Sequence, residues 1–137
     1  MFFKKDTKED LSSDIIKITA LLVHAAKIDE NFSIEEEKII KKTLIEIGVK
    51  NKDIDKLLEQ AKQIEADSVQ ILEFTKKVKE MDINNKIKII ETLWRIIYSN
   101  KKADIYETSL MRRLEGLLYI DSKIMGSIKE KIIKENS

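Results

Sequence analysis

The sequence predicts an all-α fold, a single compact bundle of about seven helices with an internal duplication. Three observations support this prediction. Proline is absent and glycine occurs only three times in 137 residues, so the two residues that interrupt helices are scarce. Apolar residues recur at spacings of three and four along most of the chain, which is the period of an amphipathic helix. A stretch of the first half also recurs, with similar spacing, in the second half.

The helical period predicts seven segments, each with its own apolar stripe. Their expected bounds are residues 9–28, 33–48, 52–66, 67–80, 84–99, 104–118 and 121–135. The first and fifth segments are apolar on most sides, and their narrow polar seams include His24 and Arg95. A helix that is apolar almost all round belongs in the middle of a bundle. We therefore expect these two helices to be central.

Capping residues are predicted for the second and fourth helices, and an apolar stripe predicts the third. Ser33 and Glu36 form a capping box, and Gly48 suits the left-handed position that follows a helix. Asp67 or Ser68 is the expected N-cap of the fourth helix. The third helix is predicted from its apolar stripe, which consists of Ile54, Leu57, Leu58, Ala61 and Ile64.

The last three helices also begin at polar residues. Asn84 is the expected N-cap of the fifth helix, and Asp104 with Glu107 is the expected start of the sixth. Asp121 or Ser122 is the expected N-cap of the seventh.

The two halves of the chain match at one constant offset. His24 matches Arg95 and Glu36 matches Glu107, with aliphatic residues paired around them. Each half is predicted to be a mostly buried helix, a short loop and a capped amphipathic helix. We expect one helical domain over residues 9–135, preceded by a flexible tail over residues 1–8. The expected parts of that domain are a first repeat (11–49), connecting helices (52–80), a second repeat (83–120) and a C-terminal helix (121–135).

The composition excludes several classes of function. Lys plus Arg is 26 and Asp plus Glu is 25, a net charge of +1, so no overall field attracts nucleic acid. The absence of cysteine excludes disulfides and thiolate chemistry and is typical of a reducing compartment. No stretch has the roughly 18 apolar residues of a membrane span. Because charged residues follow Phe2 and Phe3, we expect that the start is not a signal peptide. We expect a cytoplasmic protein.

Four oxygen-bearing residues are the candidate metal ligands: Asp29, Glu36, Asn100 and Glu107. If the two halves bring their loops together, these oxygens suit a hard divalent cation such as Ca²⁺ or Mg²⁺. A second interpretation needs no cation, because Glu36 and Glu107 are also the third residues of the two capping boxes. The sequence favours capping, and no cofactor is required.

Arginine and histidine supply the remaining candidates. Arg95, Arg112 and Arg113 are the only arginines, and their planar guanidinium groups suit the carboxylates of a partner protein. The alternative, which the sequence favours, is that they pair with acidic side chains of their own surface, namely Glu107, Glu115 or Asp121. His24 is the only histidine, and with no cysteine beside it we expect no catalytic residues and no enzyme. We expect His24 at the boundary between protein and water.

The aromatic residues Phe74, Trp94 and Tyr119 lie on apolar helical faces and are predicted to be core anchors. The lysine-rich faces are predicted to be solvated surface, and their residues are Lys76, Lys77, Lys79, Lys86 and Lys88.

The second half resembles the TerB-like family, named for tellurite resistance protein B. The residues that carry the resemblance are Leu93-Trp94, Glu107, Arg112-Arg113 and Leu117-Leu118-Tyr119. It extends over residues 11 to 132, although the family's Ala-Asp-Gly loop reads Ile28-Asp29-Glu30 and Ser99-Asn100-Lys101 here. The resemblance implies an all-helical fold and a link to metal and chemical stress. We expect a non-catalytic module that binds another protein, the alternative being a module that binds a divalent cation.

Overall fold

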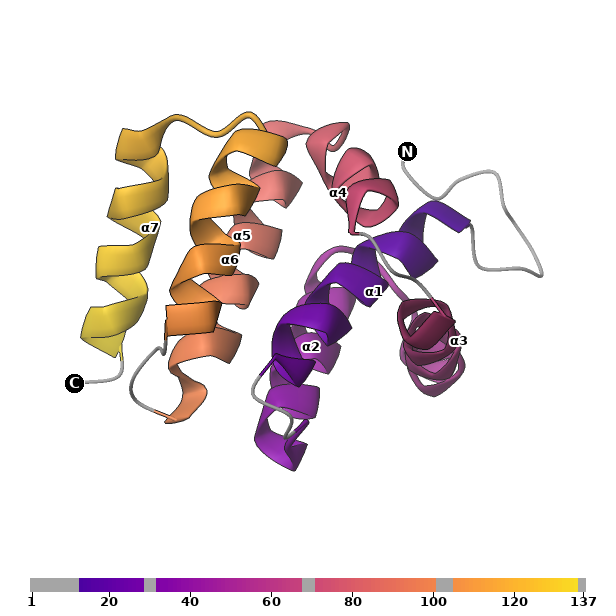
Figure 1. Cartoon of the computed structure of the whole chain (residues 1–137). Coiled ribbons are helices and arrows are strands. Elements are labelled where there is room, and N and C mark those ends of the chain that lie inside the picture. The colour runs from indigo at the N-terminus through magenta and orange to yellow at the C-terminus, as the bar shows by residue number, and fades with distance from the viewer. Residues whose placement is uncertain (1–12, 29–31, 68–70, 101–104, 136–137) are drawn as a thin grey trace.

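The computed structural model describes residues 13–28, 32–67, 71–100 and 105–135, and these are helical apart from short turns, with no strand among them. Figure 1 shows the arrangement. The helices are α1 (Ser13–Lys27), α2 (Ile34–Glu46), α3 (Ile54–Asp67), α4 (Leu72–Lys79), α5 (Ile83–Ile97), α6 (Ile105–Leu117) and α7 (Ser122–Glu135), with two 3₁₀ turns, η1 (Asn51–Asp53) and η2 (Tyr98–Asn100). The all-α prediction is confirmed.

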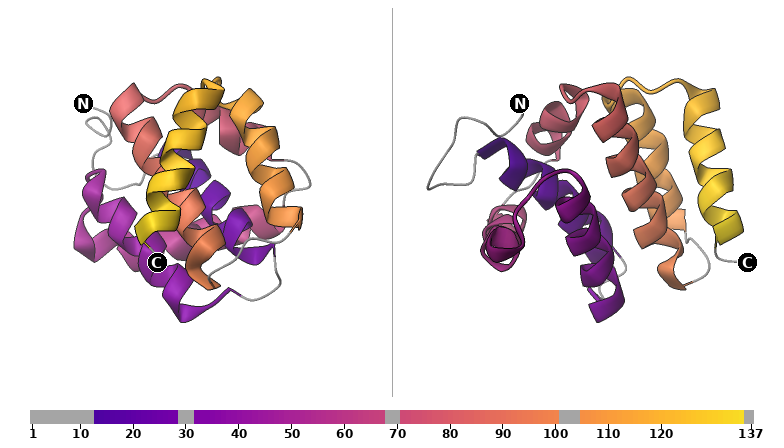
Figure 2. Two further views of the ribbon diagram at one scale, coloured as in Figure 1. Left: turned by 90° about the vertical axis from the view of Figure 1, so that its left-hand side faces the viewer. Right: turned by 180° about the vertical axis from the view of Figure 1, so that it is seen from behind.

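Helices α1 and α5 are central, as predicted. Helix α1 packs against α2, α3, α4 and α5, and α5 in turn packs against α2, α4 and α7. Figures 1 and 2 show α3 and α7 at opposite sides of the molecule, with the central pair between them. Leu21, Leu22, Ile89 and Leu93 are completely buried there. Helices α1 and α5 have the narrowest polar seams in the sequence, and they also pack against the most other helices.

The helix starts follow capping rules with two corrections. The Ser33 capping box is present, and the Asp121 carboxylate accepts a hydrogen bond from the Lys123 backbone N–H at 2.9 Å. The N-cap of α5 is Asp82 and not Asn84, because the Asp82 carboxylate reaches the Asn85 N–H at 3.1 Å.

Helix α4 also begins later than predicted. Asp67 is the last residue of α3, and the N-cap of α4 is Ile71, which makes no side-chain capping bond. Ile71 is only 4 % exposed, and its carbonyl accepts bonds from the N–H groups of Phe74 and Thr75. Burial of an apolar side chain therefore takes the place of a polar cap at this helix start. Ser68, Asp104 and the predicted tail over residues 1–8 lie outside the described residues.

Helices α2 and α6 end in the same hydrogen-bonded turn. After α2, Gly48 has φ 110° and the Val49 N–H donates to the Leu44 carbonyl at 2.9 Å. After α6, Tyr119 has φ 57° and the Ile120 N–H donates to the Glu115 carbonyl at 3.1 Å. Both arrangements place a left-handed residue just past the helix. The first and last residues of α2 match those of α6 at the same offset as His24 and Arg95, although the internal duplication itself stays a prediction.

Two of the three aromatic predictions are confirmed. Phe74 is 1 % exposed and Trp94 is 4 % exposed, whereas Tyr119 is 75 % exposed. The Tyr119 prediction was wrong because α6 ends at Leu117, so the helical period no longer sets the direction of that side chain. Lys86 was also predicted wrongly, since it is buried and its ammonium donates to the Leu118 carbonyl at 3.2 Å. It thereby satisfies a carbonyl at the end of α6 that has no partner within the helix.

Candidate functional site

Of the four candidate metal ligands, only the Glu36 side chain belongs to the described part of the chain. Glu36 is 3 % exposed, its Oε1 accepts the Ser33 backbone N–H at 2.8 Å, and its own N–H donates to the Ser33 Oγ at 3.1 Å. The capping role of Glu36 is thus confirmed. Asp29 and the side chains of Asn100 and Glu107 lie outside the description. Within the described residues, no group of three or more His, Asp and Glu side chains is placed to hold a metal, and the cation site stays a prediction.

A polar cluster joins α1 to α3 around Glu65. His24 Nδ1 lies 3.0 Å from Glu65 Oε2, and because a carboxylate only accepts, the Nδ1–H is the donor. Lys27 Nζ donates to Glu65 Oε1 at 2.6 Å. Burial raises the pKa of Glu65, but the bonds from Lys27 and His24 outweigh that effect and hold the pKa below its usual value. His24 sits at the boundary of the protein as predicted, with its side chain 31 % exposed.

Glu65 was not predicted as a site residue, although the sequence contains a signal for it. Ile54, Leu58, Ala61 and Glu65 recur at spacings of three and four, and all are buried. A carboxylate on an apolar stripe requires partners when it is buried. The matching cations lie 38 and 41 residues earlier in the chain, which is why the stripe alone could not identify them.

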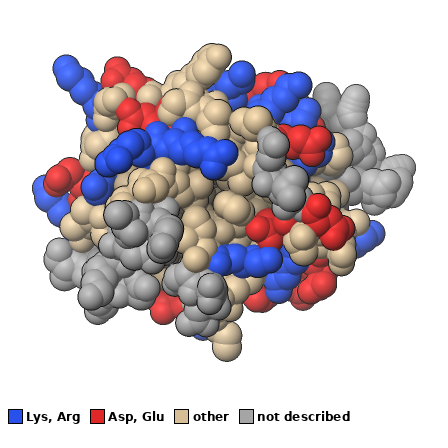
Figure 3. Space-filling view, in the orientation of Figure 1, with Lys and Arg blue, Asp and Glu red and all other residues tan. Residues whose placement is uncertain are grey.

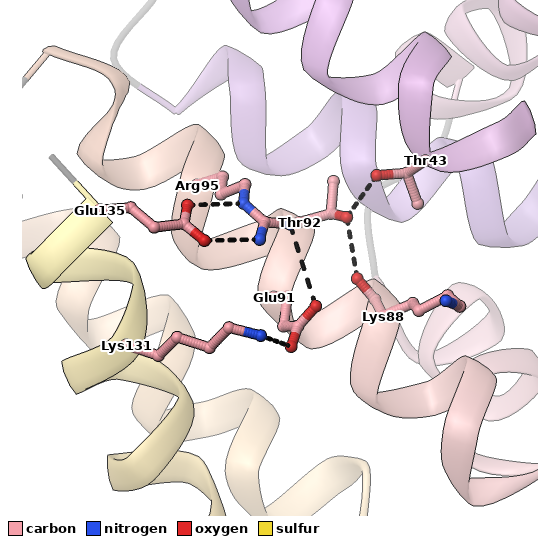
Figure 4. Close-up of polar contacts among 7 residues, drawn as sticks. All are labelled: Thr43, Lys88, Glu91, Thr92, Arg95, Lys131 and Glu135. Carbon is pink, nitrogen blue, oxygen red and sulfur yellow. Dashed lines mark hydrogen bonds and ion pairs between the residues drawn. The ribbon is translucent and has the colours of Figure 1, made fainter. Parts of the chain in front are cut away.

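A second polar cluster joins α5 to α7 (Figure 4). The Arg95 guanidinium binds the Glu135 carboxylate with two bonds, Nε to Oε1 at 3.0 Å and Nη2 to Oε2 at 2.9 Å. Lys131 Nζ donates to Glu91 Oε2 at 2.9 Å. The hydrogen bond from Arg95 lowers the pKa of Glu135 from its usual value. Arg95 therefore joins two helices of its own chain.

Figure 4 also shows how α2 is attached to α5. The hydroxyl of Thr92 donates to the Lys88 carbonyl at 2.8 Å and lies against the hydroxyl of Thr43. Both threonines are buried. Their hydroxyls satisfy each other in the core, so this contact positions α2 and leaves no polar group for a ligand.

The outer side of α6 presents the other two arginines. Ser109, Arg112, Arg113 and Gly116 are all exposed and recur at helical spacings, and we call these four residues the α6 face. Neither guanidinium forms an ion pair with any residue that the structure describes. Figure 3, in the orientation of Figure 1, shows Lys and Arg atoms across the surface where α6 lies. Within the described chain, Arg112 and Arg113 are therefore exposed without an ion pair, whereas Arg95 is paired with Glu135.

Tyr119 lies just past the end of α6 and next to the α6 face, because its backbone N–H donates to the Gly116 carbonyl at 3.3 Å. It follows Gly116 by three residues, and the Lys79 ammonium of α4 lies 4.6 Å from the centre of its ring. The opposite side of α6 is apolar, with Met111, Leu114 and Leu118 buried. One surface of α6 therefore belongs to the core and the other presents two guanidinium groups to water, with the exposed Tyr119 just past the end of the helix.

These features define an all-α bundle whose ionic contacts join helices and whose α6 face carries two arginines without an ion pair to the described residues. None of the helices in the described ranges combines the length and hydrophobicity that a membrane crossing requires. The chain belongs to the TerB family: the model of tellurite resistance protein TerB matches residues 16–130. No match was found among curated proteins or among solved structures.

Proposed function

We propose that this TerB-family chain is a non-catalytic module that binds another protein through the α6 face, in a setting of metal or chemical stress. The observation that carries the proposal is the contrast among the arginines. Arg95 is held by two bonds to Glu135, whereas Arg112 and Arg113 are exposed without an ion pair to the described residues. Adjacent guanidinium groups on a helix surface are well suited to bind carboxylates of a partner.

The absence of catalysis is part of the proposal. The chain has one histidine and no cysteine, and the Nδ1 of that histidine is occupied by the Glu65 carboxylate. A nucleophile with a neighbouring base is the usual minimum for covalent catalysis. The polar groups described above instead join helices, which supports a binding role.

Site-specific cross-linking in cells would test the proposed surface. A photoreactive amino acid at Ser109 should capture a partner protein, while the same group at Gln63, exposed on α3, should not. The double variant Arg112→Ala, Arg113→Ala should abolish the captured band, because it removes both guanidinium groups. The double variant Lys52→Ala, Lys56→Ala, which removes two other exposed cations, should leave it intact. Equal capture from Ser109 and Gln63 would contradict the proposal.

A further inference from the structure

We propose that Tyr119 is the aromatic anchor of the α6 face, and that the partner presents an acidic protein segment with apolar side chains. Its carboxylates would pair with Arg112 and Arg113, and an apolar side chain would pack on the Tyr119 ring. This inference rests on the proposed function and specifies the chemistry of the partner.

The backbone at Tyr119 gives the first argument. Its φ of 57° is the left-handed conformation, which a side chain with a Cβ adopts only at a cost. The corresponding position after α2 is Gly48, and the same type of hydrogen bond closes both turns. Glycine forms this turn without the cost, so the turn itself does not require a tyrosine.

Exposure gives the second argument. The Tyr119 side chain is 75 % exposed, so it contributes little to the core. Its ring contacts the Lys79 ammonium, which is a weak interaction at an exposed site. A single exposed aromatic residue is ordinary, but this one has a strained backbone and lies at the end of the helix that carries Arg112 and Arg113. Tyrosine and arginine are the residue types that dominate binding energy at protein interfaces.

Charge complementarity identifies the partner as acidic. Arg112 and Arg113 are exposed on α6 and Lys79 lies against the Tyr119 ring at the end of that helix, whereas the chain as a whole has a net charge of only +1. A nucleic acid or an anionic membrane is attracted by a more extended basic field. The guanidinium groups of Arg112 and Arg113 and the ring of Tyr119 instead suit a few carboxylates next to an apolar side chain. The local charge therefore favours a protein segment.

Gly116 lies between the arginines and Tyr119 along the chain, and it is exposed. A Cβ built at Gly116 would meet nothing within 4 Å, so packing within the described chain does not require glycine. Glycine in a helix interior is less favourable than alanine. A partner segment lying along the α6 face could approach the backbone closely at Gly116, which is a common reason for a glycine at a contact surface.

Selection from a displayed library of random peptides of about 16 residues, with the full chain as bait, would test the inference. Enriched peptides should be rich in Asp and Glu with a recurring aliphatic or aromatic residue. Fluorescence anisotropy should show that Tyr119→Gly weakens a selected peptide at least about tenfold. Its thermal midpoint should be unchanged or higher, because glycine relieves the left-handed strain. Arg112→Gln with Arg113→Gln should weaken the same peptide more, and Lys52→Gln with Lys56→Gln should have no effect.

The outcomes separate this inference from the proposed function. If the selected peptides need Arg112 and Arg113 but bind Tyr119→Gly unchanged, the anchor is wrong while the α6 face stands. If no peptide is enriched, or the enriched peptides lack acidic residues, the acidic segment is wrong. Single-stranded DNA, anionic vesicles and polyglutamate are compared as competitors at equal concentrations of negative charge. If DNA or vesicles displace the peptide at a lower concentration than polyglutamate does, the partner is a nucleic acid or a membrane and not an acidic protein segment. Failure of the Ser109 cross-linking experiment would instead remove the proposed function.

Discussion

The two outer helices, α3 and α7, are each joined to a central helix by an ionic contact, and the two contacts differ in burial. His24 and Lys27 of α1 hold Glu65 of α3, whereas Arg95 of α5 holds Glu135 of α7. His24 and Arg95 occupy matching positions in the two halves of the sequence. The Glu65 side chain is 10 % exposed and that of Glu135 is 40 % exposed. The same connection is therefore made once inside the protein and once at its surface.

Burial rather than the number of bonds should decide how much each contact contributes. Each carboxylate accepts two hydrogen bonds from its partners. A buried carboxylate that loses its donors keeps the full cost of desolvation, whereas an exposed one recovers its bonds from water. The α1–α3 contact should therefore be the more costly one to break, although the Arg95 contact has the better geometry.

The largest expected effect is that of Glu65→Gln. The amide keeps the shape of the side chain but removes the charge that holds Lys27 and His24, so we expect unfolding to require about 2 kcal/mol less free energy. Urea denaturation monitored by circular dichroism measures the change. Glu59→Gln, on an exposed position of the same helix, is the matched control and should change stability by less than about 0.5 kcal/mol. Equal effects of the two variants would show that burial of Glu65 contributes nothing.

Acid should weaken the same contact. Hydrogen bonds to Glu65 and to Glu135 lower the pKa of each below its usual value. A carboxylate whose folded pKa is lowered contributes stability above its unfolded pKa of about 4.3, and the contribution is lost as pH falls through the folded value. The free energy of unfolding should thus decrease between about pH 5 and pH 3. Urea titrations at these two pH values should show a smaller decrease for Glu65→Gln, and parallel decreases would contradict the assignment to Glu65.

Local signals allowed most of the helices and the central pair to be predicted from the sequence. The period of the apolar residues, the Ser33 capping box and Gly48 each act over a few residues, so one sequence contains the whole signal. Glu65 could not be paired from the sequence, because its partners lie on another helix. Tertiary contacts of this kind are determined by packing and not by spacing.

The candidate site shows the same limit. Arg112 and Arg113 were predicted to bind a partner from residue type alone, and that role stays a prediction. Arg95 was grouped with them, yet its carboxylate partner is Glu135, 40 residues away. Tyr119 was placed in the core because the helical period was continued past Leu117, where the helix ends. The direction of a side chain after a helix depends on the turn that follows.

Replacing glycine by alanine in the turn after α2 and in the interior of α7 should change stability in opposite directions. Gly48→Ala places a Cβ at φ 110° and should destabilise the protein by about 1 kcal/mol. Gly126→Ala in α7, where a Cβ would meet nothing within 4 Å, is the same substitution in a helix interior. It should stabilise by about 0.5–1 kcal/mol because alanine is the better helix former. Thermal unfolding of the two variants should give midpoints shifted in opposite directions, and shifts of the same sign would contradict the role of the turn after α2.

The smallest expected effect is that of Arg95→Lys. Lysine keeps the positive charge opposite Glu135 but cannot form both bonds, and the contact is partly exposed, so the loss should be about 0.5 kcal/mol. Trp94 reports on α7 directly, because its Nε1–H donates to the Met125 sulfur at 3.4 Å and Lys129 lies 5.4 Å from the centre of its ring. Urea unfolding followed by Trp94 fluorescence therefore measures how firmly α7 is held. Sodium chloride at about 1 M should reduce the difference between the two proteins by screening the exposed pair. A loss larger than that of Glu65→Gln would mean that the two-bond geometry of arginine, and not burial, determines the strength of these helix contacts.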